Sequence, residues 1–167
     1  LRSRGLGDVY KRQAFKQVDT EKKLVIAGGS SDTSEFENEM KELAKEDKRI
    51  IFTGFVQGQE LEELYSNAYV YALPSDLEGM PLSLLEAMSY GNCCLVSDIP
   101  ECAEVVEDKA LIFKKADVKD LQSKLQDACD HSEKVDAHKK QAADFICSKY
   151  NWDEIVQATL KLYRRKK

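Results

Sequence analysis

The chain has 167 residues, of which 43% are apolar and 33% charged, and its formal net charge is −5. This length is enough for one domain with a real hydrophobic core, and the composition is typical of a soluble globular protein. No apolar run approaches the roughly 20 residues that a transmembrane helix needs, and no signal peptide is visible at the start. No basic stripe is present, which argues against a nucleic-acid partner.

The cysteine pattern indicates a reduced, cytoplasmic protein. The five cysteines are odd in number and include no C-x-x-C spacing. Cys93 and Cys94 fall inside an apolar run, so we expect the thiols to act as small core hydrophobes. The chain has only two histidines and no Asp-x-Asp sequence, so no metal-binding residues are predicted.

The first thirteen residues, LRSRGLGDVYKRQ, show neither strand nor helix periodicity and offer few apolar anchors. Their second half resembles the translation of a sequencing-library adaptor, although a native basic arm is the alternative. We therefore interpret residues 1–13 as a non-native segment that adds nothing to the fold. Residues 14–167 are predicted to form the folded domain.

From residue 14 onward, short apolar runs alternate with helical patterns. Strands are predicted at 24–27, 50–53, 69–73, 93–97 and 110–113, and helices at 34–46, 61–68, 82–91, 101–106 and throughout the region after Asp117. This alternation is typical of an α/β fold with a doubly wound parallel sheet, in which ligands collect at the carboxyl ends of the strands. Gly28–Ser31 is predicted to be a turn, because no Gly-Lys-Ser/Thr follows it.

The stretch from Leu73 to Gly91 has the strongest local pattern. An apolar strand ends at Leu73, a loop follows, and apolar residues at helical spacing lead to a stop at Gly91. Glu78 precedes this helix and Glu86 lies in its second turn, so the two carboxylates can line one pocket about 8–12 Å long. The free N–H groups at the helix start favour an anion, typically a phosphate. On spacing alone, a pair of solvated surface glutamates is an equally good interpretation.

The wider motif resembles the retaining glycosyltransferases of family 4, also described as glycosyl transferases group 1. Their signature places E-x7-E inside S-x-x-E-G-x-P-L-x-x-L-E-A-M-x-x-G. The matching residues here are Ser75, Glu78, Gly79, Pro81, Leu82, Leu85, Glu86, Ala87, Met88 and Gly91. The likeness extends from Ala14 to Tyr163. It implies the C-terminal, donor-binding half of a GT-B transferase, a Rossmann-like domain that lacks its first strand and its N-terminal, acceptor-binding lobe.

The resemblance also implies roles for individual residues. Glu78 would face the transferred sugar as the catalytic carboxylate, and Glu86 would hydrogen-bond the ribose of a nucleotide diphosphate sugar. The residues expected to contact the donor sugar and diphosphate are Gly79, Met80, Pro81 and Leu82, and those expected near the base are Phe55 and Val56. The nucleotide sugar is the donor substrate, and no cofactor or metal is expected.

One departure from the family concerns the diphosphate. The family clamps it with a Gly-Arg pair and a later Lys, but the adaptor-like segment occupies those positions here. Arg4, Lys11 and Arg12 are therefore not assigned to that role. We expect the fragment alone to be inactive, as half of an enzyme that moves a hexose-type sugar to an unknown acceptor.

Other interpretations stay open. The chain could be a nucleotide-sugar-binding module without chemistry, or a GT-B relative such as an epimerase or a phosphorylase, although no motif for a pyridoxal-phosphate lysine is present. The cationic end Arg164–Lys167 is compatible with peripheral membrane contact of the full enzyme, but such a run is more often simply solvated.

Overall fold

The computed structural model describes residues 3–28 and 47–164, and its strands form two parallel ladders. In the first ladder, β1 (Leu24–Ala27) pairs with β2 (Ile50–Gly54). The second has the order β3 (Val70–Leu73), β4 (Cys93–Ser97) and β5 (Leu111–Phe113). A doubly wound sheet with strand order 3-2-1-4-5-6 gives these two ladders when its first strand is left out. The α/β class and the Rossmann-like half-fold predicted from the sequence are therefore confirmed.

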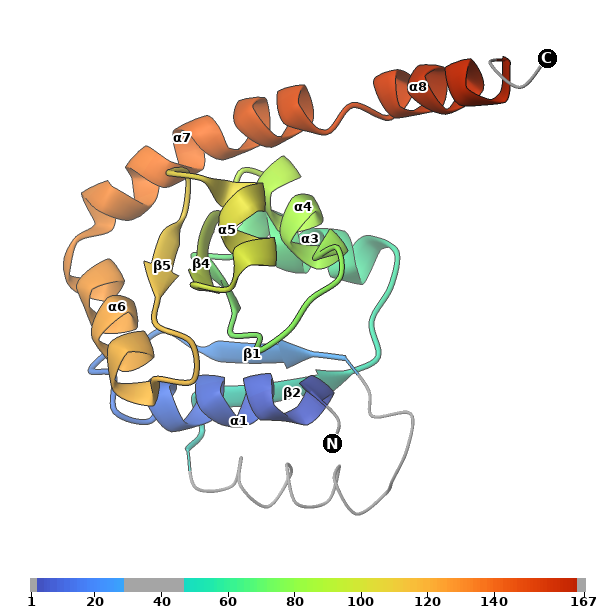
Figure 1. Cartoon of the computed structure of the whole chain (residues 1–167). Coiled ribbons are helices and arrows are strands. Elements are labelled where there is room, and N and C mark those ends of the chain that lie inside the picture. The colour runs from blue at the N-terminus through green and yellow to red at the C-terminus, as the bar shows by residue number, and fades with distance from the viewer. Residues whose placement is uncertain (1–2, 29–46, 165–167) are drawn as a thin grey trace.

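The helices follow the strands in the alternation that the sequence predicts (Figure 1). They are α1 (Ser3–Phe15), α3 (Gln59–Asn67), α4 (Leu82–Ser89), α5 (Pro100–Val106), α6 (Val118–Asp130), α7 (Ser132–Lys149) and α8 (Trp152–Arg164). Asp117 caps α6 as predicted, since its side chain accepts hydrogen bonds from the backbone N–H groups of Lys119 and Asp120. Figure 1 shows α8 extending away from the rest of the fold, and all of its residues are exposed.

The central strand β4 explains why helices cover both faces of the larger ladder. All five of its residues are buried. Successive strand residues point to opposite faces, so Cys94 and Val96 pack with α4, α5 and α7, whereas Leu95 packs with residues of α1 and α6. A strand buried on both faces reads as a continuous apolar run, which is why the sequence identifies it so clearly.

The helix α1 differs from the sequence-based expectation. The sequence predicts no structure for residues 1–13, whereas the structure has a helix from Ser3 to Phe15. Tyr10 packs with Ala14 against the core cluster of Leu95, and Arg12 is only 8% exposed. The buried positions before Ala14 are an aromatic ring and a long cationic side chain instead of an aliphatic stripe, so no apolar period was visible. The non-native origin of the segment is a separate matter and stays a prediction.

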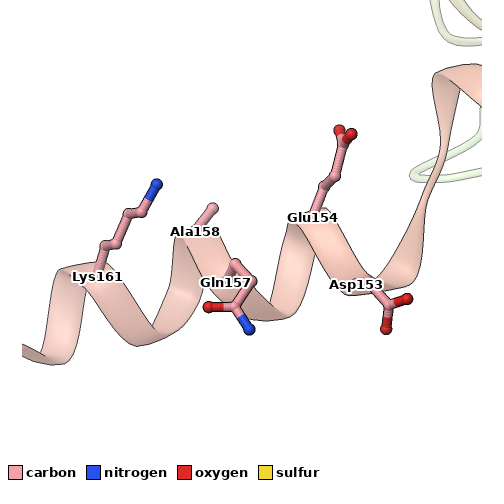
Figure 2. A pocket seen from close by; sticks show the side chains of 5 residues that line it. All are labelled: Asp153, Glu154, Gln157, Ala158 and Lys161. Atoms are coloured by element: carbon pink, nitrogen blue, oxygen red, sulfur yellow. The ribbon is translucent and has the colours of Figure 1, made fainter.

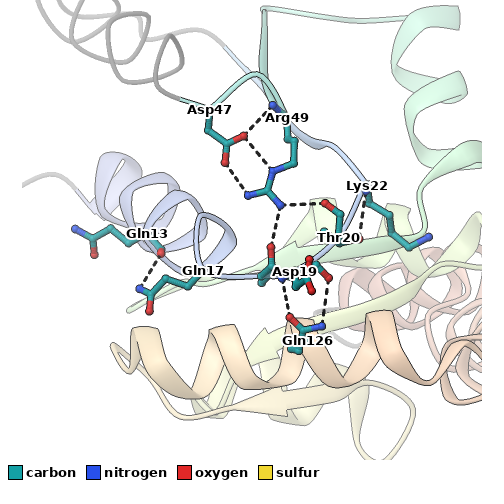
Figure 3. Close-up of polar contacts among 9 residues, drawn as sticks. Gln13, Gln17, Asp19, Thr20, Lys22, Asp47, Arg49 and Gln126 are labelled. Carbon is teal, nitrogen blue, oxygen red and sulfur yellow. Dashed lines mark hydrogen bonds and ion pairs between the residues drawn. The ribbon is translucent and has the colours of Figure 1, made fainter.

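Polar contacts fix the connection between α1 and β1 (Figure 3). Arg49 donates from Nη1 to the carbonyl oxygen of Val18 at 2.8 Å. The same guanidinium donates from Nε and Nη2 to the two carboxylate oxygens of Asp47, at 3.1 and 2.8 Å. This bidentate contact holds the pKa of Asp47 below its ordinary value. The side chain of Gln126, on α6, accepts a hydrogen bond from the backbone N–H of Asp19 at 2.8 Å and so ties the connection to that helix.

Some of the remaining predictions lie outside the described residues, and those for the cysteines are confirmed only in part. The predicted helix at 34–46 and most of the predicted turn at Gly28–Ser31 lie outside the described residues. Three of the five cysteines are buried as expected, at positions 93, 94 and 102, but Cys129 is half-buried and Cys147 is exposed. The prediction of core thiols is therefore wrong for Cys147. Within residues 3–28 and 47–164, no helix is both long and apolar enough to cross a membrane.

Candidate active site

The loop between β3 and α4 starts at the carboxyl edge of the larger ladder. Leu73 and Val96 are register partners, so the residues that follow them leave the sheet side by side. Ser97, the last residue of β4, is 1% exposed. Its hydroxyl accepts from the backbone N–H of Ser75 at 3.1 Å and donates to the backbone carbonyl of Ser75 at 2.5 Å. The start of the loop is thus held by a buried side chain of the neighbouring strand.

Ser75 also holds the side chain of Glu78. The hydroxyl of Ser75 donates to Oε1 of Glu78 at 2.5 Å, and Glu78 itself is half-buried. A hydrogen bond to a charged carboxylate is short and strong, and it restricts the side chain to few rotamers. The predicted catalytic carboxylate is therefore fixed above the ends of β3 and β4.

The start of α4 offers fewer backbone donors than the sequence predicted. Pro81 is the N-cap instead of the first helical residue, and its carbonyl oxygen accepts from Leu84 at 2.9 Å. The N–H of Leu82 already donates to the carbonyl oxygen of Met80 at 2.9 Å, and proline has no N–H. The N–H groups of Gly79 and Met80 have no partner among the described residues, and both residues are exposed. These two N–H groups are exposed donors that a ligand can reach.

Glu86 lies on the second turn of α4 and is exposed, yet one of its oxygens is engaged. The hydroxyl of Tyr65, on α3, donates to Oε2 of Glu86 at 3.2 Å. Tyr65 is buried, and its ring stacks on that of Tyr90 with centroids 5.4 Å apart and planes at 20°. Burial raises the pKa of Tyr65, as do Tyr71 and the Glu86 carboxylate, so the phenol stays protonated and can only donate to this acceptor.

Tyr71 of β3 is a third titratable group in this region. Its pKa is raised to about 12, first of all by burial; a hydrogen bond from Ser83 lowers it, and Cys94, Glu78 and Glu86 add to the rise. The two predicted glutamates belong to one strand–loop–helix unit, with Glu78 before the N-cap residue Pro81 and Glu86 within α4.

The two residues predicted near the base are not joined to this corner by any contact within the described residues. Phe55 directly follows β2 and is 75% exposed, and Val56 is half-buried. They occupy the carboxyl end of a strand in the smaller ladder. Among the described residues, no three His, Cys, Asp or Glu side chains form a group able to hold a metal ion.

The family model described as "Glycosyl transferases group 1" matches residues 11–145 of this chain. The chain belongs to this family. The match includes β1, β2, the loop between β3 and α4 that carries Glu78 (the glutamate loop), and α4, and it runs into α7. The resemblance inferred from the motif is thereby confirmed.

Two relatives are similar to this chain over part of their length. The chain is 34% identical over 109 residues to N,N'-diacetylbacillosaminyl-diphospho-undecaprenol alpha-1,3-N-acetylgalactosaminyltransferase of Campylobacter jejuni, which covers 64% of this chain and 28% of that protein. It is 30% identical over 148 residues to an uncharacterized glycosyltransferase of Methanocaldococcus jannaschii, covering 85% of this chain and 37% of the relative. The chain thus spans less than half the length of these relatives.

Solved structures confirm the fold. The Anabaena protein HepE, solved in complex with UDP and glucose, superposes with a TM-score of 0.85 at 15% identity, over 95% of this chain and 45% of that one. Sucrose-phosphate synthase from Thermosynechococcus elongatus superposes with a TM-score of 0.82 at 24% identity, over 99% of this chain and 43% of the other. At these identities the similarity establishes the GT-B fold and not the substrate.

Three residues that build this corner of the fold were not identified from the sequence. Tyr65 reads as one apolar position of a helix stripe, and Ser97 as the end of an apolar strand. Asn92 is 2% exposed, and its amide donates to the carbonyl oxygens of Tyr65 at 2.9 Å and Ala87 at 3.0 Å, which joins α3 to α4. The only sequence signal for Asn92 and Ser97 was that these polar residues stand at the two ends of the apolar run of β4.

A surface depression on α8 does not qualify as the site. It is lined by Asp153, Glu154, Gln157, Ala158 and Lys161 (Figure 2). All five residues belong to α8, and every residue of that helix is exposed. Side chains from one exposed helix cannot enclose a ligand, so the loop between β3 and α4 stays the candidate site.

Proposed function

We propose that this chain is the donor-binding half of a retaining glycosyltransferase that takes a hexose-type sugar from a nucleotide diphosphate sugar. One observation carries the proposal. Glu78 and Glu86 lie on either side of the start of α4 at the carboxyl edge of the larger ladder; Glu78 accepts a hydrogen bond from Ser75 of its own loop, and Glu86 accepts one from Tyr65 of α3. The carboxyl edge of a doubly wound sheet is where such folds bind ligands.

Glu86 is the residue we assign to the ribose. An exposed carboxylate with one oxygen held by Tyr65 can accept from sugar hydroxyls with the other. The structures of HepE in complex with UDP and with UDP-glucose support a nucleotide ligand for this fold. The proposal does not specify the nucleotide base, because no contact among the described residues joins Phe55 or Val56 to the two glutamates.

Glu78 is assigned to the transferred sugar. Breaking a glycosyl bond builds positive charge on the sugar ring and negative charge on the leaving diphosphate. A carboxylate beside the ring stabilises the first charge. The N–H groups of Gly79 and Met80, together with the positive end of α4, stabilise the second. No step in this scheme requires a metal ion.

The chain alone is proposed to bind the donor without transferring sugar. It spans 28% and 37% of two curated relatives, so a longer protein would supply the acceptor-binding lobe. The acceptor therefore cannot be assigned from this chain. The relatives differ in the sugar that they transfer, N-acetylgalactosamine in one and mannose in another, so membership of the family does not fix the sugar.

Calorimetric titration with UDP, GDP, ADP and inorganic pyrophosphate tests the donor site. We expect one nucleoside diphosphate to bind clearly more tightly than pyrophosphate. Replacing Glu86 with Ala should weaken that binding by about 1.5–3 kcal/mol, the range for a hydrogen bond to a charged group. Glu104→Ala is the matched control, because Glu104 is an exposed glutamate on α5, and its affinity should equal that of the wild type.

The outcomes separate two claims. If no nucleoside diphosphate binds at millimolar concentration, the donor-binding proposal is wrong. If one binds and Glu86→Ala binds it equally well, the donor site stands and the ribose assignment fails.

A further inference from the structure

We propose that Tyr65 is a positioning residue for ribose recognition, acting on the ligand only through Glu86. This inference rests on the proposed function, since it concerns how the chain holds the nucleotide of the donor. The hydroxyl of Tyr65 donates to Oε2 of Glu86 at 3.2 Å, although the two residues lie 21 positions apart on different helices.

The ring of Tyr65 is held independently of that hydrogen bond. It is buried at 9% exposure and stacks on Tyr90, with 5.4 Å between centroids, and it lies 5.9 Å from the ring of Tyr71. A ring fixed by two aromatic neighbours delivers its hydroxyl to one place. The donor position therefore does not depend on Glu86 itself.

The backbones of the two helices are also tied together at this point. The buried amide of Asn92 donates to the carbonyl oxygen of Tyr65 at 2.9 Å and to that of Ala87, the residue after Glu86, at 3.0 Å. The side chain of Asn92 thus links the backbone of Tyr65 to the backbone of the residue that follows Glu86. The Tyr65–Glu86 pair belongs to a rigid frame instead of being a chance surface contact.

The consequence concerns the carboxylate of Glu86, which would otherwise rotate freely on an exposed helix position. Anchoring Oε2 leaves Oε1 without a partner among the described residues and available to one ribose hydroxyl. An acceptor fixed before binding loses less rotamer entropy when the ligand arrives. Removing the Tyr65 hydroxyl should therefore reduce the preference for ribose, whereas a purely structural tyrosine would affect all ligands alike.

The experiment compares two ligands and several variants of the whole chain. The probes are the preferred ribonucleoside diphosphate from the titrations above and its 2′,3′-dideoxy counterpart, which lacks both ribose hydroxyls. Tyr65→Phe keeps the stacked ring and removes the hydroxyl. We expect the ratio of the two affinities to fall about tenfold in Tyr65→Phe, with little change in the affinity for the dideoxy ligand.

Two further proteins make the result specific. Tyr69→Phe removes a tyrosine hydroxyl that donates to the carbonyl oxygen of Ala128 at 2.7 Å, and it should leave the affinity ratio unchanged. In a Glu86→Ala background, the addition of Tyr65→Phe should have no further effect on the ratio, because the group through which it acts is gone.

Each outcome decides the inference. An unchanged ratio in Tyr65→Phe, an equal loss for both ligands, or a failure of Tyr65→Phe to fold would assign the hydroxyl to structure alone and overturn it. A tenfold effect that persists in the Glu86→Ala background would overturn the route through Glu86. A wild-type chain that binds neither ligand would instead refute the proposed function.

Discussion

The backbone of Gly7 lies so close to the carbonyl oxygen of Pro74 that a Cβ added to Gly7 would be 2.6 Å from it. Real Cβ atoms do not approach a backbone oxygen so closely, so either α1 or the glutamate loop would have to move. α1 is therefore seated directly on the loop that carries Glu78.

This close approach predicts the effect of Gly7→Ala. Alanine favours a helix over glycine by up to about 1 kcal/mol, yet the clash with Pro74 should make the variant less stable by about 1–3 kcal/mol in urea denaturation. Gly79→Ala is the control, because a Cβ at Gly79 meets nothing within 4 Å and its φ is not positive. Its stability should stay within about 0.5 kcal/mol of the wild type. Equal stabilities for the two variants would show that α1 does not pack there.

The contact between Ser97 and Ser75 gives a second prediction. Ser97→Ala removes the partner of the carbonyl oxygen of half-buried Ser75 and leaves the Ser75 N–H only its bond to Leu73, so the free energy of unfolding should fall by about 1–2 kcal/mol. Ser148→Ala also removes a serine hydroxyl, one that donates to the carbonyl oxygen of Phe145 on its own exposed helix face. That control should change stability by less than about 0.5 kcal/mol. A Ser97→Ala protein as stable as the control would mean that water replaces the hydroxyl without cost.

The sequence predicts the sheet better than it predicts the packing around it. β1 and β4 have the predicted bounds, since apolar runs ending at Gly28 and Asp98 leave little ambiguity. The last turn of α1 carries the buried apolar residues Ala14 and Phe15, but the turns before it were not predicted, because Gly7, Tyr10 and Arg12 carry no apolar period. A close backbone approach is a property of two segments far apart in the chain, and neither segment reveals it alone.

In the candidate site, too, residues of a local motif were predicted, whereas a residue that depends on packing between helices was not. The local motif was enough to find Glu78 and Glu86, because their spacing and the proline between them belong to one strand–loop–helix unit. Tyr65 could not be assigned from the sequence, since its hydrogen bond to Glu86 depends on how α3 packs against α4. Residues that position a side chain from another element become visible only in the folded structure.

The third prediction concerns pH. The contact with Arg49 lowers the pKa of Asp47 below its ordinary value of 3.8. A lowered pKa in the folded state stabilises the protein above the unfolded pKa, and this contribution is lost as the pH falls through the folded pKa. Asp47→Asn should therefore be less stable than the wild type by about 0.5–1 kcal/mol at neutral pH, and the difference should vanish in acid.

Urea denaturation from neutral pH to well below 3.8 measures this difference. Arg49→Met provides the control, because without the guanidinium the Asp47→Asn change should show no such pH dependence. Parallel stability curves for wild type and Asp47→Asn across the whole range would contradict the assignment.

The last prediction distinguishes the two glutamates in a longer protein that contains this chain and an acceptor-binding lobe. Glu86, if it binds ribose, makes contacts that are similar in the ground and transition states. Glu86→Ala should therefore raise the donor KM, corresponding to about 1.5–3 kcal/mol, with a smaller change in kcat. Glu78→Gln keeps the size of the side chain and can still accept from Ser75, but it removes the charge that the developing cation needs. Its kcat should fall while the affinity for the free nucleoside diphosphate barely changes. Steady-state kinetics and calorimetry on both variants give the comparison, with Glu104→Ala as the control. Normal turnover by Glu78→Gln would remove it from the chemistry, and normal kinetics in both variants would reduce the two glutamates to a surface pair.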